Sequence, residues 1–268
     1  MSELGDSTRE KLKYFTEDTK FTFDDKWHRY RYEGRNLESA TTFLKQFKKP
    51  FDVEFFSKKI AKRDGMTQSA VKAMWAEKGR VSRDEIGTPV HLFCERHLEG
   101  ADDAELDLLY ADMIPLAQQR VDNWLNIYDE KVSKYEQVAN EVRIFDLGYG
   151  LGGTFDNIFV YKDKLYISDY KTNEKLTVDG DFCYGNKLKD VFQGLDDNDL
   201  NGFSIQTSIY RLILSKADIH IDGAFVIWLP PSPAKGRGVV CKDFQDRLRR
   251  HFDEETSDKK LYDGLLDT

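Results

Sequence analysis

The sequence predicts an α/β fold, with a mixed central β-sheet flanked by helices and a helical N-terminal part. Helical patterns occupy most of residues 39–130 and are followed by three consecutive strand patterns. A further helix is expected over residues 203–217 and an apolar strand over 223–232. No internal repeat or low-complexity linker interrupts the 268 residues, so one domain is the simplest arrangement.

The first elements are expected to be a hairpin followed by short helices. Residues 20–34 alternate aromatic and polar side chains, which is typical of a β-hairpin. Ser39 is a suitable N-cap for the next helix, and Pro50 would stop it. Two more helical patterns follow, over residues 53–65 and 67–81, with Thr67 as the cap of the second.

Proline and glycine suggest the limits of the next two helices. One is expected to begin at Thr88 as N-cap, with Pro89 in the first helical position and Gly100 after its end. A long amphipathic pattern covers residues 105–132, with a break before Pro115.

The second half alternates strands and helices. Strands are expected over residues 135–147 and in a hairpin over 154–172, and residues 179–202 are polar and predicted to be irregular. The helix at 203–217, the strand at 223–232 and a closing amphipathic helix over 242–255 complete the chain.

Charge is distributed unevenly. The net charge of −8 argues by itself against binding to nucleic acid. Residues 41–80, however, hold ten Lys and Arg against four acidic residues, whereas residues 101–130 hold eight acidic residues against one Arg. This asymmetry permits a basic surface on an acidic protein; solvated helix faces would explain it equally well.

The sequence gives no sign of a membrane or secretion segment. It has no run of 18 apolar residues, and residues 1–15 lack the apolar centre of a secretion signal. The three cysteines, Cys94, Cys183 and Cys241, are far apart and odd in number. Reduced thiols in an intracellular protein are therefore expected, without a disulfide framework or a CxxC metal site.

Asp156, Asp169 and Lys171 lie in otherwise strand-forming sequence. A turn at Lys162-Asp163, or a wider one over 161–164, would bring all three to one end of one sheet face. The register would pair residue 160 with 165, 158 with 167 and 156 with 169. The opposite face would be aromatic, with Phe155, Phe159, Tyr161, Tyr166 and Tyr170.

Two neighbouring carboxylates that are partly withdrawn from water repel one another, at an uncompensated cost of several kcal/mol. A divalent cation would offset this better than Lys171 alone, and carboxylate oxygens suit Mg²⁺, with Mn²⁺ as a substitute. The alternative is that the charges merely protect an edge strand from aggregation.

These residues resemble the PD-(D/E)xK nuclease superfamily. The "GGTFD" segment supplies Asp156, and "SDYK" supplies Asp169 and Lys171, with Phe155 in place of the proline of the family name. A histidine upstream in "GTPVH" and the "QTSIY" segment after the core strands are similar to the RecB-like branch. The N-terminal hairpin and the "LESATTFLKQFKKPFD" segment resemble phage-type exonucleases similar to the mitochondrial genome-maintenance exonuclease.

The resemblance implies a restriction-endonuclease-like core and a metal site. Asp156, Asp169, His91 and the backbone carbonyl of Tyr170 would bind Mg²⁺, and Glu95, one turn after His91, would bind it through water or only solvate its helix. A structural role for His91 would be favoured if this residue stood alone.

Lys171, with Asp156 and Asp169, would form the catalytic set. It would orient or deprotonate the attacking water, or stabilise charge on the phosphate, with one or two metal ions.

Other residues are candidates for contacts with DNA. Gln206 and Tyr210 would face the active site, either to contact a phosphate or to hold Lys171 in place. Ser39 and Thr42 are further candidates for phosphate contacts. Phe43, Phe47 and Trp75 would stack on bases or belong to the core. Glu141, on the strand before the motif, is either a further acidic site residue or an ordinary strand carboxylate.

The resemblance implies a metal-dependent DNA exonuclease that acts from single-stranded ends in phage-type replication, recombination or turnover, in the host cytoplasm. Proteins of replication or recombination would be its partners. Residues 1–86 would form the DNA-binding part and 87–268 the nuclease core. The alternatives are a flap or junction endonuclease and a non-catalytic nucleic-acid-binding module. Some RecB-like proteins hold an iron–sulfur cluster with four cysteines; with three, this chain is expected to lack one.

Overall fold

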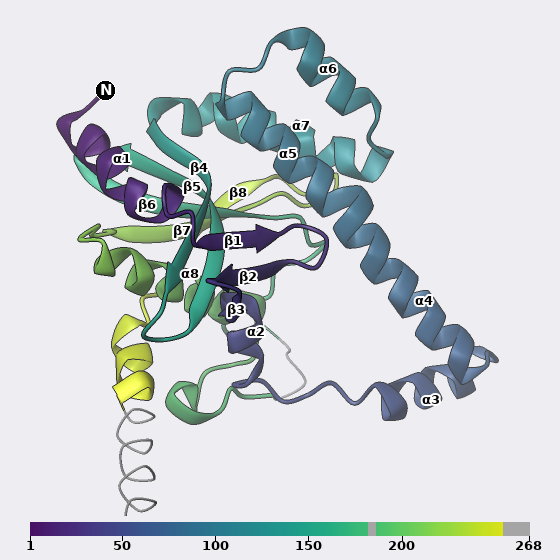
Figure 1. Ribbon diagram of the computed structural model, residues 1–268. Coiled ribbons are helices and arrows are strands. Elements are labelled where there is room, and N and C mark those ends of the chain that lie inside the picture. The colour runs from purple at the N-terminus through teal and green to yellow at the C-terminus, as the bar shows by residue number, and fades with distance from the viewer. Residues whose placement is uncertain (182–185, 254–268) are drawn as a thin grey trace, which may run out of the picture.

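The computed structural model describes residues 1–181 and 186–253. Within these ranges eight strands form one mixed sheet with helices on both faces, which confirms the predicted fold class (Figure 1). The strands are β1 (Phe21–Asp24), β2 (Arg29–Tyr32), β3 (Arg35–Ser39), β4 (Glu136–Asp146), β5 (Leu151–Tyr161), β6 (Lys164–Lys171), β7 (Gly223–Trp228) and β8 (Arg237–Val240).

The strand order is β1-β2-β3-β5-β6-β7-β8, and β4 pairs with β5 as well. β3 runs parallel to β5 and β6 runs parallel to β7, whereas the other pairs are antiparallel. The predicted meander β4-β5-β6 is therefore confirmed. On its β5 side, β3 pairs only with Leu151 and Gly152 at the start of β5. These positions lie beyond the last residue of β5 that pairs with β6. The sheet thus forks along β5, and the fork opens next to Asp156.

Two of the three pairs predicted for the β5–β6 hairpin, 160 with 165 and 158 with 167, are confirmed. Lys162 and Asp163 form its two-residue turn, with φ values of 51° and 56°, the left-handed conformation of a tight hairpin turn. Val160 lies opposite Leu165 and Ile158 opposite Ile167, and pairing continues to Asn157 and Ser168. Asp156 and Asp169 are the next residues on the two strands, where the hairpin opens into the fork.

The helices of the described chain begin and end close to the expected positions in most cases. They are α1 (Glu3–Thr16), α2 (Ala40–Lys45), α3 (Val53–Asp64), α4 (Gln68–Arg80), α5 (Thr88–Leu98), α6 (Asp103–Ala111), α7 (Pro115–Glu130) and α8 (Asp199–Lys216). A π-helix, η1 (Val81–Gly87), and two 3₁₀ turns, η2 (Val132–Lys134) and η3 (Asp190–Phe192), complete the set, and residues 245–253 are also helical. The predicted caps Ser39 and Thr67 and the break before Pro115 are confirmed.

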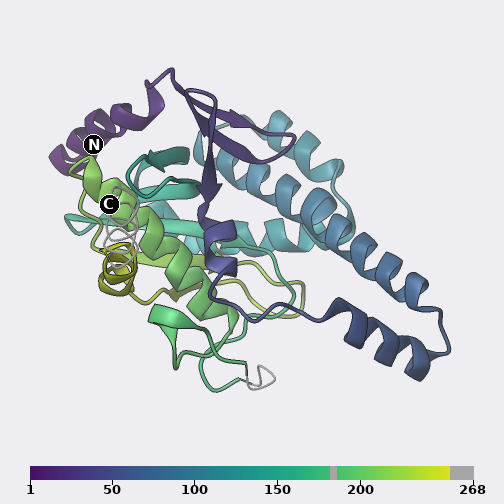
Figure 2. The ribbon, with the colours of Figure 1, turned by 60° about the horizontal axis from the view of Figure 1, so that its bottom comes forward.

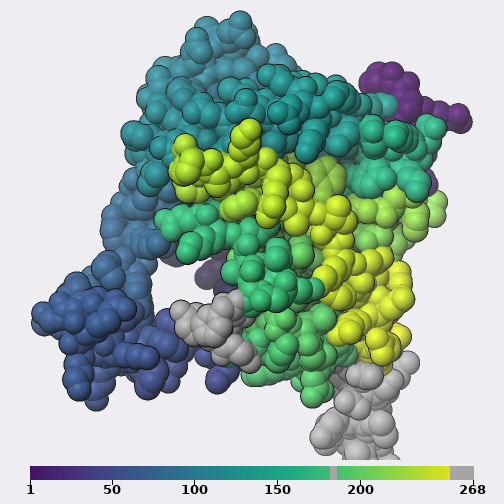
Figure 3. Space-filling view, turned by 180° about the vertical axis from the view of Figure 1, so that it is seen from behind, coloured from purple at the N-terminus to yellow at the C-terminus, as the bar shows by residue number. Residues whose placement is uncertain are grey.

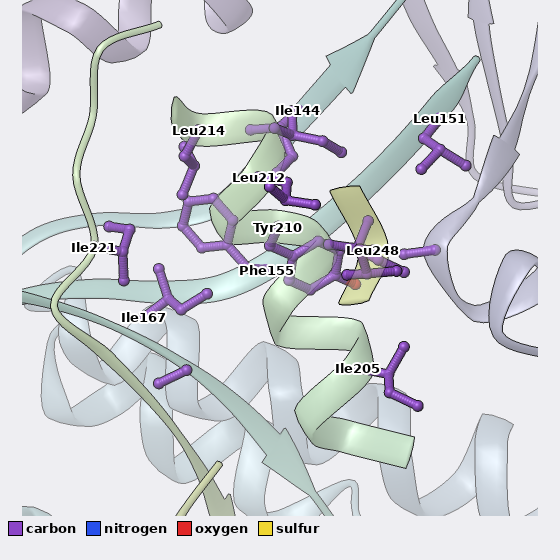
Figure 4. Packing of buried hydrophobic residues seen from close by; sticks show 14 of the residues in the cluster. Ile144, Leu151, Phe155, Ile167, Ile205, Tyr210, Leu212, Leu214, Ile221 and Leu248 are labelled. Atoms are coloured by element: carbon purple, nitrogen blue, oxygen red, sulfur yellow. The ribbon is translucent and has the colours of Figure 1, made fainter. Parts of the chain in front are cut away.

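Two apolar clusters hold the layers together. One contains residues of α1, α2 and α8 against one face of the sheet, and Figure 4 shows Ile205, Tyr210 and Leu212 of α8 among its members. The other joins α5 and α7 to the opposite face through Trp124, Phe159 and Tyr170.

Phe155 does not lie on the aromatic face, as the sequence predicted. It packs in the first cluster, as Ile158 does, whereas Phe159 packs in the second. The alternation of faces therefore shifts between Phe155 and Ile158. On the neighbouring strand β4, Glu141 has a φ of 44°, so a local irregularity in the ladder accompanies the shift.

The prediction that Thr88 caps a separate helix is wrong. α4, η1 and α5 form one continuous helix over residues 68–98, and the residue before Thr88 is itself helical. Pro89 lacks a donor, and its ring crowds the carbonyl group four residues earlier in a regular α-helix. The wider turns of η1 come immediately before it and accommodate this crowding. Gly100, with a φ of 78°, follows the end of the helix as expected.

Helices α3 and α4 form an arm that extends away from the sheet (Figures 1 and 2). Residues 46–52 lead from α2 into α3 without helix or strand, and α4 returns to the body through α5. The boundary expected between residues 86 and 87 falls inside this continuous helix. The preceding residues also contribute β1, β2 and β3 to the shared sheet.

Several elements were not predicted, namely α1, β3 and β8. The described part of the segment 179–202 is irregular apart from η3 and the first turn of α8, and Cys183 lies outside the described residues. α8 begins four residues before the expected position, at Asp199. The closing helix begins at residue 245 rather than 242, and residues 254–255 of its predicted range are outside the described chain. None of the described helices has the length and apolar character needed to span a membrane.

Candidate active site

A cleft of about 820 Å³ opens where β5 and β6 diverge. Its walls come from the ends of these strands, from α5, from α8 and from the β1–β2 hairpin. It gathers nearly all of the predicted site residues: Ser39, His91, Glu95, Asp156, Asp169, Tyr170, Lys171, Gln206 and Tyr210. Thr42 is not among the residues that line it.

Asp156 lies at the centre of the cleft and is only 6% exposed. Its Oδ1 lies 3.2 Å from Nδ1 of His91, and its Oδ2 accepts a hydrogen bond from the backbone N–H of Tyr170. Burial acts to raise the pKa of Asp156, but His91, the Tyr170 N–H and Lys171 outweigh it, so the pKa is lowered. For His91, burial acts to lower the pKa, but Asp156 overcomes it and raises the pKa to about 9. In the absence of metal, these two residues therefore form an ion pair.

Glu141 is a third acidic member of the group, and of its two predicted roles the structure favours a position in the site over that of an ordinary strand carboxylate. It lies on β4, and its carboxylate lines the same cleft as Asp156. Burial, reinforced by the negative charge of Asp156, raises the pKa of Glu141 to about 8. The signal that could have singled it out is its position on the strand that pairs with the one carrying Asp156.

Asp169 and Lys171 form the second half of the site. Their side chains make an ion pair, and Asp169 is 5% exposed. Burial and the nearby Asp156 raise the pKa of Asp169, although Lys171 opposes them. Burial acts to lower the pKa of Lys171, but Asp169 outweighs it and raises the pKa, so the lysine is a partly buried cation.

Two residues of α8 support Lys171. Its Nζ donates to Oε1 of Gln206 at 3.4 Å, and Nε2 of Gln206 donates to the Tyr210 hydroxyl at 2.7 Å. The Tyr210 ring lies against Gly153, where a Cβ atom would be 2.4 Å from a ring carbon. A glycine is thus needed at this position of β5. Of the two predicted roles for Gln206 and Tyr210, the geometry favours holding Lys171; contact with DNA stays a prediction.

The donor atoms of His91, Glu141 and Asp156 lie within 4.8 Å of one another, which suits a bound cation. An imidazole with two carboxylates is a donor set for Mn²⁺ or Mg²⁺. The structure groups Glu141 with the predicted ligands His91 and Asp156, whereas Asp169 is paired with Lys171. Glu141 was not in the predicted ligand set, and the roles of all these residues as ligands stay predictions.

The remaining predicted residues have less central positions. Glu95 lines the cleft one turn beyond His91, and burial raises its pKa. Ser39 caps α2 and donates to the Thr42 hydroxyl. Phe43 and Phe47 are buried in the first apolar cluster, so they are core residues and do not stack on bases. Cys94 and Cys241 are buried free thiols.

No family model and no curated protein matches this chain.

Cation binding at this site is expected to become tighter as the pH rises. A cation displaces the proton of His91, whose pKa is about 9, and that of Glu141, whose pKa is about 8. Both pKa values are raised, so both groups hold protons at pH 7, and Mn²⁺ affinity should increase at least about tenfold between pH 7 and pH 9. Calorimetry in two buffers of different ionisation enthalpy would measure the protons released. Glu141→Gln should release fewer, whereas an affinity independent of pH would contradict the assignment of these two ligands.

Proposed function

We propose that this protein is a metal-dependent DNA exonuclease that hydrolyses phosphodiester bonds from single-stranded ends. The observation that supports this best is the placement of Asp156, Asp169 and Lys171 in one cleft, with His91 and Glu141 beside them. A retired site would have no reason to keep three acidic side chains this close, because each opposes the ionisation of the others.

Different residues of the cleft would bind the metal ion, stabilise charge on the phosphate and position Lys171. A bound Mg²⁺ or Mn²⁺ would lower the pKa of a water molecule and neutralise charge on the phosphate. His91, Glu141 and Asp156 would hold that ion. Lys171 carries its charge beside them and can donate a hydrogen bond to the attacking water or to a phosphate oxygen. Gln206 and Tyr210 limit the positions that its ammonium group can take.

The arm formed by α3 and α4 favours action at an end of the strand. Figure 3 shows an opening between the arm and the body, with α4 along one side. The chain is continuous around the arm, from α2 through α3 and α4 to α5, which carries His91. Lys78 of the arm pairs with Glu174 at 3.6 Å, and Lys48, in the segment before α3, pairs with Asp197 at 2.9 Å. A strand that enters such an opening must supply a free end.

The arm also has the charge that DNA requires. Among the described residues, Lys58, Lys59 and Lys62 of α3, and Lys49 in the segment before it, make no ion pair. Free lysines of this kind are available to phosphates, and their contribution decreases with salt concentration. This part of the chain offers a basic surface although the net charge is −8. In the setting that the resemblance implies, the enzyme would act in a host cytoplasm beside replication or recombination proteins.

End-labelled DNA tests this proposal. The substrates are a linear single strand, the same strand blocked at both ends by streptavidin, a closed single-stranded circle and a linear duplex, each with Mg²⁺ or with EDTA. We expect the free linear strand to be degraded with Mg²⁺, and the circle and the blocked strand to survive. Lys171→Ala should be inactive on all of them.

Other outcomes would replace the proposal. Cleavage of the circle at a rate similar to the linear strand would favour an endonuclease. If neither Mg²⁺ nor Mn²⁺ supports cleavage of any substrate, the catalytic proposal fails, and a non-catalytic binding module becomes the better account. The position of the retained label on a shortened strand reports the polarity.

A further inference from the structure

The loop between β1 and β2 presents an exposed aromatic side chain with cations on either side of it in the sequence. Trp27 is 60% exposed. Nζ of Lys26 lies 5.3 Å from the centre of its ring, and the guanidinium carbon of Arg29 lies 5.7 Å from it. Tryptophan offers a large flat apolar surface, and neighbouring cations attract phosphates. Such a combination suits a base and its backbone together.

The hairpin is fixed to the strands that carry the catalytic carboxylates. The Tyr30 hydroxyl lies 3.0 Å from the hydroxyl of Thr154, two residues before Asp156. The ring of Tyr30 packs so closely against Gly152 that a Cβ atom there would lie 2.8 Å from the nearest ring carbon. These contacts place the base of the hairpin directly on β5.

The tip of the hairpin is held as well. Arg143, two residues after Glu141 on β4, donates to Asp25 at 3.2 Å and lies 4.6 Å from the centre of the Phe23 ring. The His28 ring meets the Phe23 ring edge to face, with 5.0 Å between ring centres. Trp27 therefore has a defined position relative to the active site.

The same tip borders the cleft. Phe23, Asp25 and His28 line it together with His91 and Asp156, whereas Trp27, between Asp25 and His28 in the sequence, lies at the tip outside this lining. Figure 1 shows the β1–β2 loop on the side of the sheet where α5 runs. A strand whose phosphate lies at Asp156 would continue past this tip on its way out of the cleft.

We propose that Trp27 stacks on one unpaired base of the bound strand, while Lys26 and Arg29 contact the phosphates beside that base. This inference rests on the proposed function and adds a specific requirement, an unpaired base at one fixed distance from the bond that is cut. A paired base would have both faces covered by its neighbours and could not occupy this place.

The test uses binding, so that it is separate from cleavage. Fluorescein-labelled single strands, each with one abasic position, are titrated with the full-length protein by anisotropy. Ca²⁺ replaces Mg²⁺, and a gel confirms that the strands stay intact. The proteins are the wild type, Trp27→Ala, Trp27→Phe and, as a control, Tyr14→Ala, which removes an exposed aromatic residue of α1 rather than of the β1–β2 loop.

With the intact strand, Trp27→Ala should bind about 10- to 100-fold more weakly, and Trp27→Phe and Tyr14→Ala should bind nearly as the wild type does. For the wild type, one abasic position should weaken binding by a similar factor, and Trp27→Ala should be insensitive to that same lesion. If Trp27 had only a structural role, Trp27→Ala would bind every abasic strand more weakly than the wild type by the same factor.

Two results would overturn the inference: unchanged binding by Trp27→Ala, or a loss that is the same for every abasic position. If the wild type degrades linear strands and either result is found, only the role of Trp27 is wrong. If the wild type neither binds nor cuts any strand, the proposed function fails, and the role of Trp27 fails with it.

Discussion

Asp156→Asn is expected to decrease the rate of phosphodiester hydrolysis by about 10³-fold, with little change in the fold. Asp156 is the carboxylate shared by the His91 ion pair and the candidate cation site. A bound cation lowers the free energy of the transition state by several kcal/mol. Each 1.36 kcal/mol corresponds to a factor of about ten in rate. An asparagine oxygen can still accept from the Tyr170 N–H, but it carries no charge to hold the metal or the protonated His91.

The rate would be measured under single-turnover conditions on a labelled strand, with Mn²⁺ affinity measured separately. Asp163→Asn is the matched control, because it makes the same chemical change in the turn of the same hairpin, where asparagine tolerates the left-handed backbone. We expect this control to keep wild-type activity. If Asp156→Asn kept activity within about tenfold of the wild type, the assignment of the catalytic cleft would be wrong.

Trp124→Ala is expected to lower the free energy of unfolding by about 3–5 kcal/mol. The indole of Trp124 is fully buried in the second apolar cluster, and its ring meets the Tyr170 ring at 5.2 Å in an edge-to-face contact. Alanine would leave a cavity that the rigid layers of α7 and the sheet cannot close. Equilibrium denaturation in urea, followed by circular dichroism, would measure the change.

Trp124→Phe separates packing from polarity. Among the described atoms the indole N–H of Trp124 has no hydrogen-bond partner, so phenylalanine loses volume but no hydrogen bond. We expect it to recover much of the lost stability. A loss below about 1 kcal/mol for Trp124→Ala would show that α7 repacks freely. In the expected case, activity should also fall, because Tyr170 donates its N–H to Asp156.

The local elements with strong patterns could be predicted from the sequence. The register of the β5–β6 hairpin follows from a two-residue turn between strands whose apolar residues alternate, and Asp156 and Asp169 follow its last pair into one cleft. The caps at Ser39 and Thr67 have side chains that accept backbone hydrogen bonds, and such residues are hard to mistake.

The elements that were missed depend on contacts between distant segments. β3 and β8 are short strands whose pairing with β5 and β7 gives them their structure. Glu141 enters the site through an irregular backbone position opposite Asp156, and no spacing in the sequence reports this. For α1 the signal was present, since Leu4, Thr8, Leu12 and Phe15 follow a helical spacing after the Ser2 cap.

Continuity from α4 through η1 to α5 was missed because Thr88-Pro89 is typical of a helix start. A proline inside a helix lacks a donor and crowds the preceding turn, and here π turns relieve the crowding. The error at one dipeptide therefore concealed the connection between the arm and His91.

Because this helix is unbroken, the number of residues in α4 determines both the direction and the distance of α3 relative to His91. An α-helix turns by about 100° and advances about 1.5 Å per residue. Adding one residue to α4 would swing α3 around the helix axis while His91 stayed in place, and adding seven would almost restore its direction at a greater reach. We therefore expect α4 to tolerate insertions of seven residues, about two turns, better than insertions of one residue. Such insertions would widen the opening and keep the direction of α3.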